Sequence, residues 1–405
     1  MKILSNLIRH PFFGPIIFLL VYFITPIFIT QFFNPTNLSN KIFYVIVVIL
    51  FILISEIIFI FTYKVINNEY YKKKSKTPFE KIIVSPHPNL PFILKKNSPP
   101  MVEKKKLSFT LNKNSYFAPA LSTNNLGYLN GPDGGRDVLI PKPKGLFRVN
   151  CLGESNTQYY LSDKNGTYSW PLELEKILKK KKLNLEVNNC GTGSYTSSDL
   201  LVRFLLQIAD TSPDVVVIYH AYTDIRTYLT KGFESDYSHS RKNLGEEYYK
   251  YYFGSLLPYV PLNFINFIQN KWFPQNHRYS LVESISQGEI DVNTTDVQKG
   301  LLTYERNIQN IITICKARNI EVMLCTYCYY LHEKVKDSKI HKTYENIVSK
   351  TNNIIKKLSE NNNIKLVDAC KLIPKNNKNF VDVVHFSPEG MKSLANIISE
   401  KIKLD

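Results

Sequence analysis

The sequence predicts an α/β protein: a flavodoxin-like three-layer α/β/α domain with a five-stranded parallel sheet, preceded by a transmembrane helical hairpin. Three observations support this fold class. From residue 147 onward, short apolar runs alternate with amphipathic runs of helical period, which is typical of βαβ units. Two long, nearly uncharged runs lie before that pattern. The 405 residues, 44% of them hydrophobic, are ample for one such core with additional segments.

The first 66 residues contain two candidate membrane helices. No charged residue occurs from Phe12 to Phe33, and only Glu56 occurs from Ile42 to Tyr63. Each run reaches the ~20 residues that a helix needs to cross a bilayer. No small-residue cleavage site follows the first run, which argues against a signal peptide. We therefore expect a hairpin that makes the lipid bilayer a partner of this chain.

Basic residues are distributed unequally around this hairpin. The connecting loop, residues 34–41, holds only Lys41, whereas its outer flanks hold Lys2, Arg9, Lys64, Lys72, Lys73, Lys74 and Lys76. The positive-inside rule then predicts that both termini, and the domain that follows, lie in the cytoplasm.

Residues 67–146 are rich in Lys, Pro and Asn. The segments 87–91 and 98–100 contain prolines that argue against helix, and Gly-rich turns follow near residues 124–135. We expect a connecting segment with a small β extension, and a simple spacer is the alternative.

The domain itself spans residues 147–405. Strands are expected at 147–153, 185–190, 214–219, 321–326 and 364–368, with helices at 170–178, 198–209, 304–318 and 344–358. An insertion at about 225–301 interrupts the alternation. The strand order 2-1-3-4-5 places the end of the first strand near the switch point of the sheet, where open α/β sheets bind their ligands.

Ser155 follows that first strand directly. The apolar run from Phe147 ends abruptly at Gly153, so the Ser155 hydroxyl is expected at the carboxyl edge of the sheet, where a nucleophile is presented. A Gly-x-Ser tripeptide alone also fits an ordinary turn serine.

A second block, Asp382-Val-Val-His385, lies near the other end of the chain. A serine hydroxyl needs a base to take its proton, and a carboxylate to orient that base. Ser387 as N-cap and Pro388 at the first helical position predict a helix immediately afterwards, which would hold His385 on a short loop.

These two blocks resemble the SGNH (GDSL-type) hydrolase superfamily over roughly residues 147–405. The resemblance implies a membrane-anchored serine esterase or O-acyl transferase acting on a carbohydrate O-acetyl group or a lipid ester, with Ser155, Asp382 and His385 as catalytic residues and no cofactor. Hydrolysis and transfer use the same machinery, so both stay open. Anchored members of the superfamily often act outside the cytoplasmic membrane. A domain outside the cytoplasm is therefore the alternative to the cytoplasmic domain that the basic residues predict.

The resemblance also implies an oxyanion hole. Its donors would be the N–H of Ser155, the N–H of Ser194 at a position where glycine is expected, and Thr223 in place of asparagine. Ala221 replaces a glycine, and Glu154 replaces the aspartate of the serine block. These departures favour an alternative, a non-catalytic membrane-tethered module that binds glycan or lipid through a degenerate site.

The insertion contains further candidates. His239 and Arg241 are possible substrate-binding residues, because long insertions are often functional, although a structural turn is the simpler interpretation. Apolar positions 260, 264, 265, 268 and 272 fit one helical face, which predicts a lid, a membrane-interface helix or a helix packed on the domain.

Charge and cysteine content add little. The net charge is +17 and the pI about 9.3, but no basic motif has nucleic-acid spacing, so no nucleic-acid partner is expected. Cys325 and Cys328 have redox or zinc spacing without a second pair. We expect buried free thiols and no metal site.

Overall fold

The computed structural model describes residues 136–229, 232–239, 294–331 and 338–404 of the domain, preceded by stretches at 46–47, 50, 84–85, 87–99, 105–106, 116–118 and 121–130. The chain divides into two compact units, Met1–Thr77 with Asn243–Arg278 and Pro78–Lys242 with Tyr279–Asp405. Every strand that the structure describes belongs to the second unit. The domain boundaries at residues 66 and 146 stay predictions.

The predicted membrane hairpin lies outside the described residues, apart from Ile46, Val47 and Leu50. Among the helices that the structure describes, none is both long and apolar enough to cross a bilayer. The predicted amphipathic helix at residues 260–272 also lies outside the described residues.

The main sheet has seven strands, so the expectation of five was wrong. Five strands are parallel and follow the predicted order 2-1-3-4-5: β10 (Leu185–Asn189), β7 (Phe147–Gly153), β11 (Val215–Tyr219), β12 (Glu321–Cys325) and β13 (Lys365–Val367). Two antiparallel strands, β6 (Leu129–Asn130) and β5 (Ser122–Thr123), extend the sheet beyond β10. Two-residue strands are too short to leave an alternating pattern in the sequence, which is why their pairing with the main sheet was not predicted.

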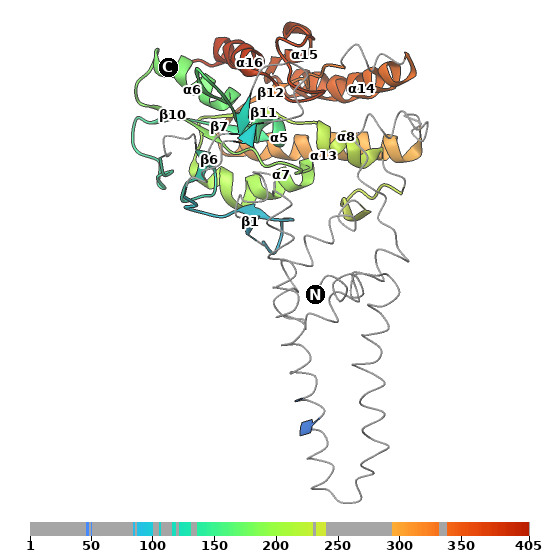
Figure 1. Ribbon diagram of the computed structural model, residues 1–405, viewed down its shortest axis with the longest axis horizontal. Coiled ribbons are helices and arrows are strands. Elements are labelled where there is room, and N and C mark those ends of the chain that lie inside the picture. The colour runs from blue at the N-terminus through green and yellow to red at the C-terminus, as the bar shows by residue number, and fades with distance from the viewer. Residues whose placement is uncertain are drawn as a thin grey trace, which may run out of the picture. The chain divides into compact units, whose positions relative to one another are not determined.

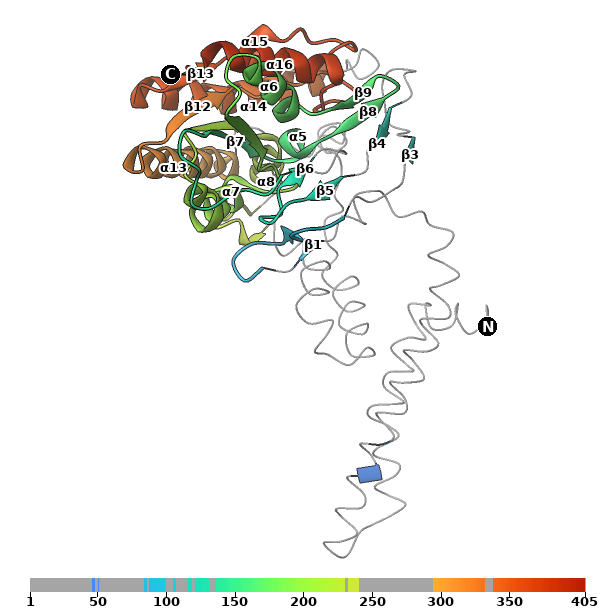
Figure 2. The same cartoon turned by 90° about the vertical axis from the view of Figure 1, so that its left-hand side faces the viewer.

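Helices cover both faces of the sheet (Figure 1). The helices α6 (Trp170–Lys179) and α16 (Pro388–Lys401) pack on one face, and α7 (Ser197–Arg203) and α13 (Thr295–Ala317) on the other. The long helix α14 (Ser338–Asn362) contributes to both cores. Figure 2 shows the same layers after a quarter turn. The prediction of a three-layer α/β/α domain is therefore confirmed.

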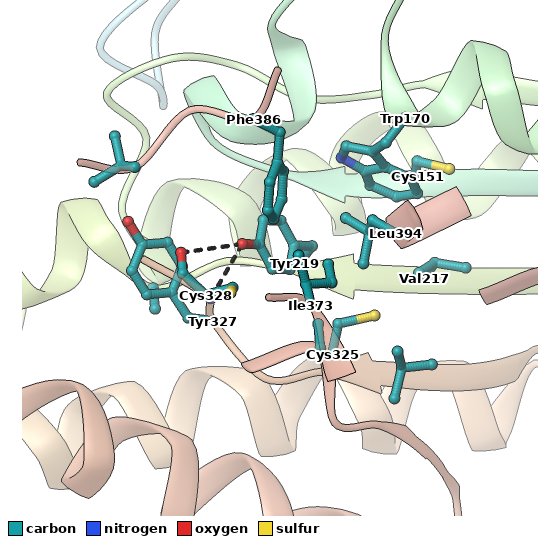
Figure 3. Packing of buried hydrophobic residues seen from close by; sticks show 14 of the residues in the cluster. Cys151, Trp170, Val217, Tyr219, Cys325, Tyr327, Cys328, Ile373, Phe386 and Leu394 are labelled. Carbon is teal, nitrogen blue, oxygen red and sulfur yellow. Dashed lines mark hydrogen bonds between the residues drawn. The ribbon is translucent and has the colours of Figure 1, made fainter. Parts of the chain in front are cut away.

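Alternate residues of each central strand enter the two cores. Cys151, Val217 and Cys325, on three neighbouring strands, face Trp170 and Leu394 in one core (Figure 3). The next residues along the strands, among them Leu152, Val216 and Leu324, enter the other core. This double burial explains why the strands are continuous apolar runs rather than alternating ones.

Among the described helices, α6, α7, α13 and α16 begin at polar caps. Ser169 and Ser387 accept hydrogen bonds from Leu172 N (3.3 Å) and Gly390 N (3.2 Å), so the predicted cap of α16 is confirmed. Thr196 and Asp199 form a reciprocal capping box at α7. A π-helical turn, Phe204–Ile208, and a 3₁₀ turn, Ala209–Thr211, extend α7 toward β11.

Smaller elements surround the sheet. A four-stranded antiparallel sheet joins β3 (Lys105–Lys106), β4 (Phe117–Ala118), β8 (Leu161–Asp163) and β9 (Gly166–Tyr168), and β1 (Val84–Ser85) pairs with β2 (Ile93–Leu94). The short helices are α5 (Ser155–Gln158), α8 (Tyr222–Tyr228) and α15 (Ala369–Leu372). Short strands therefore occur in the segment for which a β extension was expected.

A buried arginine ties the amino ends of the strands together. The Arg148 side chain is 0% exposed and forms an ion pair with Glu186 on β10. Its guanidinium also donates to the carbonyl oxygens of Thr211 and Leu139, the latter at 3.0 Å. A buried charge needs such partners. This cluster therefore holds together the amino-terminal ends of the strands, at the edge of the sheet opposite Ser155.

Gly300 allows α13 to approach α8, and its replacement tests this packing. A Cβ atom at residue 300 would lie 1.8 Å from Cβ of Tyr228. Gly300→Ala should therefore lower the free energy of unfolding by about 1–3 kcal/mol, since the overlap outweighs alanine's better helix propensity. Urea denaturation measures the change.

Lys299→Ala is the matched control, because residue 299 is an exposed neighbour on the same helix. Its unfolding free energy should stay within about 0.5 kcal/mol of the wild type. A Gly300→Ala variant as stable as the control would contradict the close approach of α8 and α13.

Candidate active site

A glycine permits the sharp turn that presents Ser155. A Cβ atom at Gly153 would lie 2.1 Å from Oγ1 of Thr157 and 2.2 Å from the carbonyl oxygen of Tyr219. Only glycine lets α5 fold back so closely onto the end of β11. The Thr157 hydroxyl donates to that same carbonyl oxygen at 3.2 Å. Ser155 consequently begins α5 at the carboxyl edge of the sheet.

The loop after β10 also closes on α5. A Cβ atom at Gly191 would lie 2.4 Å from the backbone nitrogen of Gln158, so only a glycine fits there. The Gly193 N–H donates to Oε1 of Gln158 at 2.6 Å. Two neighbouring strand ends therefore fix the short helix that carries Ser155.

The three residues of the two sequence blocks meet at this edge. Nε2 of His385 lies 3.2 Å from Oγ of Ser155, and Nδ1 of His385 lies 2.7 Å from Oδ2 of Asp382. The side chains of His385 and Asp382 are 21% and 27% exposed, so the histidine is reachable from solvent. Hydroxyl, imidazole and carboxylate thus form a continuous hydrogen-bonded chain.

Local hydrogen bonds hold the loop that carries His385. The Asp382 carboxylate accepts from the N–H groups of Val384 (2.8 Å) and His385 (2.7 Å). The Val381 N–H donates to the His385 carbonyl oxygen at 2.9 Å, and the Tyr330 N–H donates to the Val383 carbonyl oxygen at 2.9 Å. This confirms the expectation that His385 lies on a short, fixed loop.

Aromatic contacts complete the support of the imidazole. The ring of Tyr159, which follows α5, lies 4.6 Å from the His385 ring. Phe386 stacks on Tyr219 at 5.8 Å, and the Tyr219 hydroxyl bonds to the backbone of Cys328 (Figure 3). These contacts therefore connect the end of β11, the loop after β12 and the residue that follows His385.

Electrostatics favour the charged forms of both partners. Burial alone would lower the pKa of His385, but the charge and hydrogen bond of Asp382, and the charge of Glu154, raise it above its usual value. Burial would raise the pKa of Asp382, but the interaction with His385 and two backbone N–H groups lowers it. Asp382 therefore stays ionised and accepts the Nδ1–H of His385, and the site favours the imidazolium more than water does.

The structure distinguishes the predicted oxyanion donors. Ser194 has φ of 64°, the left-handed conformation that favours glycine, so its backbone takes the shape expected of the glycine it replaces. Thr223 differs, because its hydroxyl donates to Oε2 of Glu154. In this arrangement the Thr223 hydroxyl hydrogen is already engaged.

Asp224 organises a buried network behind this edge. Its carboxylate accepts from the Ser197 N–H and hydroxyl (both 2.7 Å), the Tyr237 hydroxyl and Nε2 of His220 (2.6 Å). These bonds join α7, α8 and the first turn of the insertion. These contacts give Asp224 a structural role.

Of the two candidate residues in the insertion, the structure describes His239. Nδ1 of His239 accepts from the Glu234 N–H at 3.0 Å, and Nε2 lies 3.1 Å from the Thr227 carbonyl oxygen. Both ring nitrogens therefore bond to backbone and close a turn. Arg241 lies outside the described residues. Substrate binding by either residue stays a prediction.

The Cys325-x-x-Cys328 spacing does not define a thiol pair. Cys325 lies buried on β12, whereas the Cys328 thiol hydrogen-bonds with Cys370, 42 residues further on. Within the described part of the chain, no three His, Cys, Asp or Glu side chains gather as metal ligands would.

Sequence reasoning missed two residues of this site. Glu154 was noted only as a departure from the Gly-Asp-Ser pattern, yet its carboxylate bonds to the start of α8. Tyr159 contacts His385 although nothing in the sequence sets it apart from the other 25 tyrosines. The position of Glu154 directly before Ser155 could have identified it as a site residue, whereas nothing in the sequence identifies Tyr159.

Comparison with known proteins gives a family. Residues 151–392, more than half of the chain, match the model of the GDSL-like lipase/acylhydrolase family. No curated protein matches the sequence significantly.

Three solved structures illustrate the similarity. A GDSL-like lipase from Bacteroides thetaiotaomicron is 16% identical with a TM-score of 0.37, over 65% of this chain and 91% of that one. A lipase/acylhydrolase from Enterococcus faecalis is 15% identical with a TM-score of 0.39, over 64% and 95%. A catalytic mutant of an acetylxylan esterase from Geobacillus stearothermophilus is 16% identical with a TM-score of 0.38, over 64% and 95%.

Removing the carboxylate beside His385 tests the electrostatics. Asp382→Asn should lower the pKa of His385, because the variant loses the charge that favours the imidazolium. The protonated form would then be lost at lower pH than in the wild type. Histidine NMR with ¹³C-labelled imidazoles measures this titration, and His385→Gln assigns the signal.

Glu173→Gln serves as the control, since Glu173 is a buried glutamate on α6 that pairs with Lys176. It should leave the His385 titration unchanged. An Asp382→Asn variant that titrates like the wild type would show that Asp382 is not the acceptor.

Proposed function

The chain belongs to the GDSL-like lipase/acylhydrolase family, whose members hydrolyse acyl esters, and from that premise we propose that it is a membrane-anchored serine esterase or O-acyl transferase. Its substrate is an acyl ester, either an O-acetyl group on a carbohydrate or a lipid ester. One observation supports the proposal most strongly. A hydrogen-bonded chain runs from the Ser155 hydroxyl through His385 to Asp382.

In this proposal, Ser155 is the nucleophile. Its Oγ attacks the carbonyl carbon of the ester while Nε2 of His385 takes the hydroxyl proton, as the 3.2 Å separation allows. Asp382 accepts the Nδ1–H at 2.7 Å, which fixes the tautomer with Nε2 free and stabilises the imidazolium that forms.

The developing oxyanion needs hydrogen-bond donors. The N–H groups of Ser155 and Ser194 fill this role in our proposal, and the φ of 64° at Ser194 supports it. Thr223 was expected as a third donor, but its hydroxyl would have to leave Glu154 to serve. The site is therefore proposed to work with two backbone donors.

The second half-reaction decides between hydrolysis and transfer. Collapse of the tetrahedral intermediate returns the proton from His385 to the leaving alcohol and leaves an acyl group on Ser155. Water or a sugar hydroxyl then attacks that acyl group, with His385 again as the base. The two outcomes differ only in the acceptor.

The membrane anchor is the second part of the proposal. Two nearly uncharged runs within residues 12–63 support a helical hairpin, and the basic residues on its outer flanks support a cytoplasmic domain. Such an anchor would keep the protein at the membrane.

A fluorophosphonate probe tests the nucleophile. Ser155 should attack phosphorus and displace fluoride, giving one covalent label per chain on the wild type and none on Ser155→Ala. The same substitution should lower turnover of p-nitrophenyl acetate by roughly 10⁴-fold or more. Mass spectrometry of the labelled peptide and steady-state rates measure both effects.

His239→Ala is a useful companion variant, since both ring nitrogens of His239 bond to backbone in a turn. It should still take the label at Ser155. Equal labelling of wild type and Ser155→Ala would contradict the proposal. Product analysis with and without a carbohydrate acceptor then separates hydrolysis from transfer.

A fusion to the C-terminus tests sidedness. Alkaline phosphatase, which is active only outside the cytoplasm, should be inactive as a C-terminal fusion, whereas a fluorescent protein that matures in the cytoplasm should be bright. The opposite pattern would place the domain outside the cytoplasm while leaving the catalytic proposal intact.

A further inference from the structure

Glu154 holds a buried negative charge immediately before Ser155. Its side chain is 0% exposed. Oε1 accepts from the N–H groups of Ala221 (3.3 Å) and Tyr222 (2.6 Å), and Oε2 accepts from the N–H (2.6 Å) and hydroxyl of Thr223. Four donors thus converge on one carboxylate, and all of them come from the corner between β11 and α8.

These donors are neutral groups. Among the described residues, no Lys, Arg or His side chain forms an ion pair with Glu154, unlike the buried Glu186, which pairs with Arg148. Burying a carboxylate without a cation is costly unless its hydrogen bonds replace those of water. Backbone N–H groups can be satisfied by a neutral amide or hydroxyl oxygen, so anchoring the corner does not by itself require a charge.

The charge belongs to the residue directly before Ser155, whose Oγ lies 3.2 Å from Nε2 of His385. Glu154 and Asp382 both favour the protonated form of His385, and together they outweigh the effect of its burial. In acyl transfer by this site, His385 becomes an imidazolium as Ser155 attacks. A fixed anion near that imidazolium stabilises the charge that develops during the reaction.

We propose that Glu154 is a positioning residue with two effects: it holds the β11–α8 corner against the Ser155 turn, and it stabilises the protonated His385 that arises on attack. This inference rests on the proposed serine mechanism. It also assigns the Thr223 hydroxyl to Glu154 rather than to the oxyanion, because one hydroxyl hydrogen cannot serve both.

Several other ionisable side chains surround this charge, and their effects must be separated from it. The groups whose titration Glu154 influences, besides His385, are His220, Tyr228, Tyr304, Tyr327 and Tyr344. The charged group that acts most strongly on His385 is Asp382, and Tyr159 is the aromatic ring against it. Burial raises the pKa values of these tyrosines, so among the groups named here His220 is the one whose titration must be separated from that of His385.

The pH dependence of fluorophosphonate labelling tests the inference on the full chain. In this reaction the Ser155 Oγ–P bond forms, the P–F bond breaks, fluoride leaves and the hydroxyl proton goes to His385. The second-order labelling rate therefore follows the neutral fraction of His385, and its acidic limb reports the pKa of that residue. The wild type, Glu154→Gln, Glu154→Asp and Glu173→Gln are compared.

Glu154→Gln should differ from the wild type in two ways. The midpoint of the acidic limb should move to lower pH, because the variant lacks a charge that raises the pKa of His385. The plateau rate should fall roughly 10-fold or more, because the amide N–H₂ faces backbone donors and displaces the corner. Glu173→Gln, a buried glutamate on α6, should match the wild type in both.

Glu154→Asp separates the effect of the carboxylate charge from the effect of the side-chain length. It keeps the carboxylate, so its midpoint should stay at the wild-type value. It is one methylene shorter and cannot span the same donors, so its plateau should fall about threefold or more. This variant also carries the test if Glu154→Gln fails to fold, which thermal unfolding reveals.

Some results would overturn the inference while the proposed function stands. These are a wild-type midpoint in Glu154→Gln, an equal midpoint shift in both Glu154 variants, or a wild-type plateau in Glu154→Asp. Absence of label on the wild type at every pH would instead contradict the proposed function. Histidine NMR of His385 would then test the electrostatic part directly, and an unchanged titration in Glu154→Gln would refute it.

Discussion

The close approach of three strand ends governs this site. The chain that leaves β7 must turn within the space between the end of β11 and the loop after β10, and Gly153 and Gly191 provide that space. A Cβ atom would lie 2.1 Å from Oγ1 of Thr157 at residue 153 and 2.4 Å from the backbone nitrogen of Gln158 at residue 191, both closer than packed atoms can approach. Because Ser155 lies in this turn, its placement is a consequence of sheet packing and not of loop flexibility. The central position of β7, between β10 and β11, makes the constraint possible.

Carboxylates dominate the electrostatics of the same edge. Glu154, Asp224 and Asp382 each accept hydrogen bonds from backbone N–H groups that start a helix or close a loop. His220 and His385 each bond to one of them, and in both histidines the carboxylates outweigh burial and raise the pKa. At this edge of the sheet, fixed N–H dipoles therefore surround buried carboxylates. Such an environment stabilises a charge that develops during a reaction, because the protein groups need not rearrange.

The sequence predicted the parts of the site that depend on local pattern. Ser155 follows an apolar run that ends at a glycine, and His385 precedes a helix with recognisable start signals, so their chain positions carried the information. The order of the parallel strands followed from the alternation of strands and helices. The residues that depend on distant neighbours were not predictable in the same way. Arg148, the second residue of β7, is fully buried because Glu186 and two carbonyl oxygens lie beside it. Likewise, the partners of Glu154 lie 67 to 69 residues away.

The two antiparallel strands that extend the sheet have a consequence for solubility. The strand β6 pairs with β10 at Asn189 and so covers N–H and C=O groups at the end of β10 that could otherwise pair with another chain. The outermost strand, β5, has only two residues and is too short to template such pairing. At the opposite edge, β13 is only three residues long and begins with Lys365, whose ammonium pairs with Glu321. Both margins of the sheet therefore end in strands of two or three residues, which offer little backbone for pairing with another molecule.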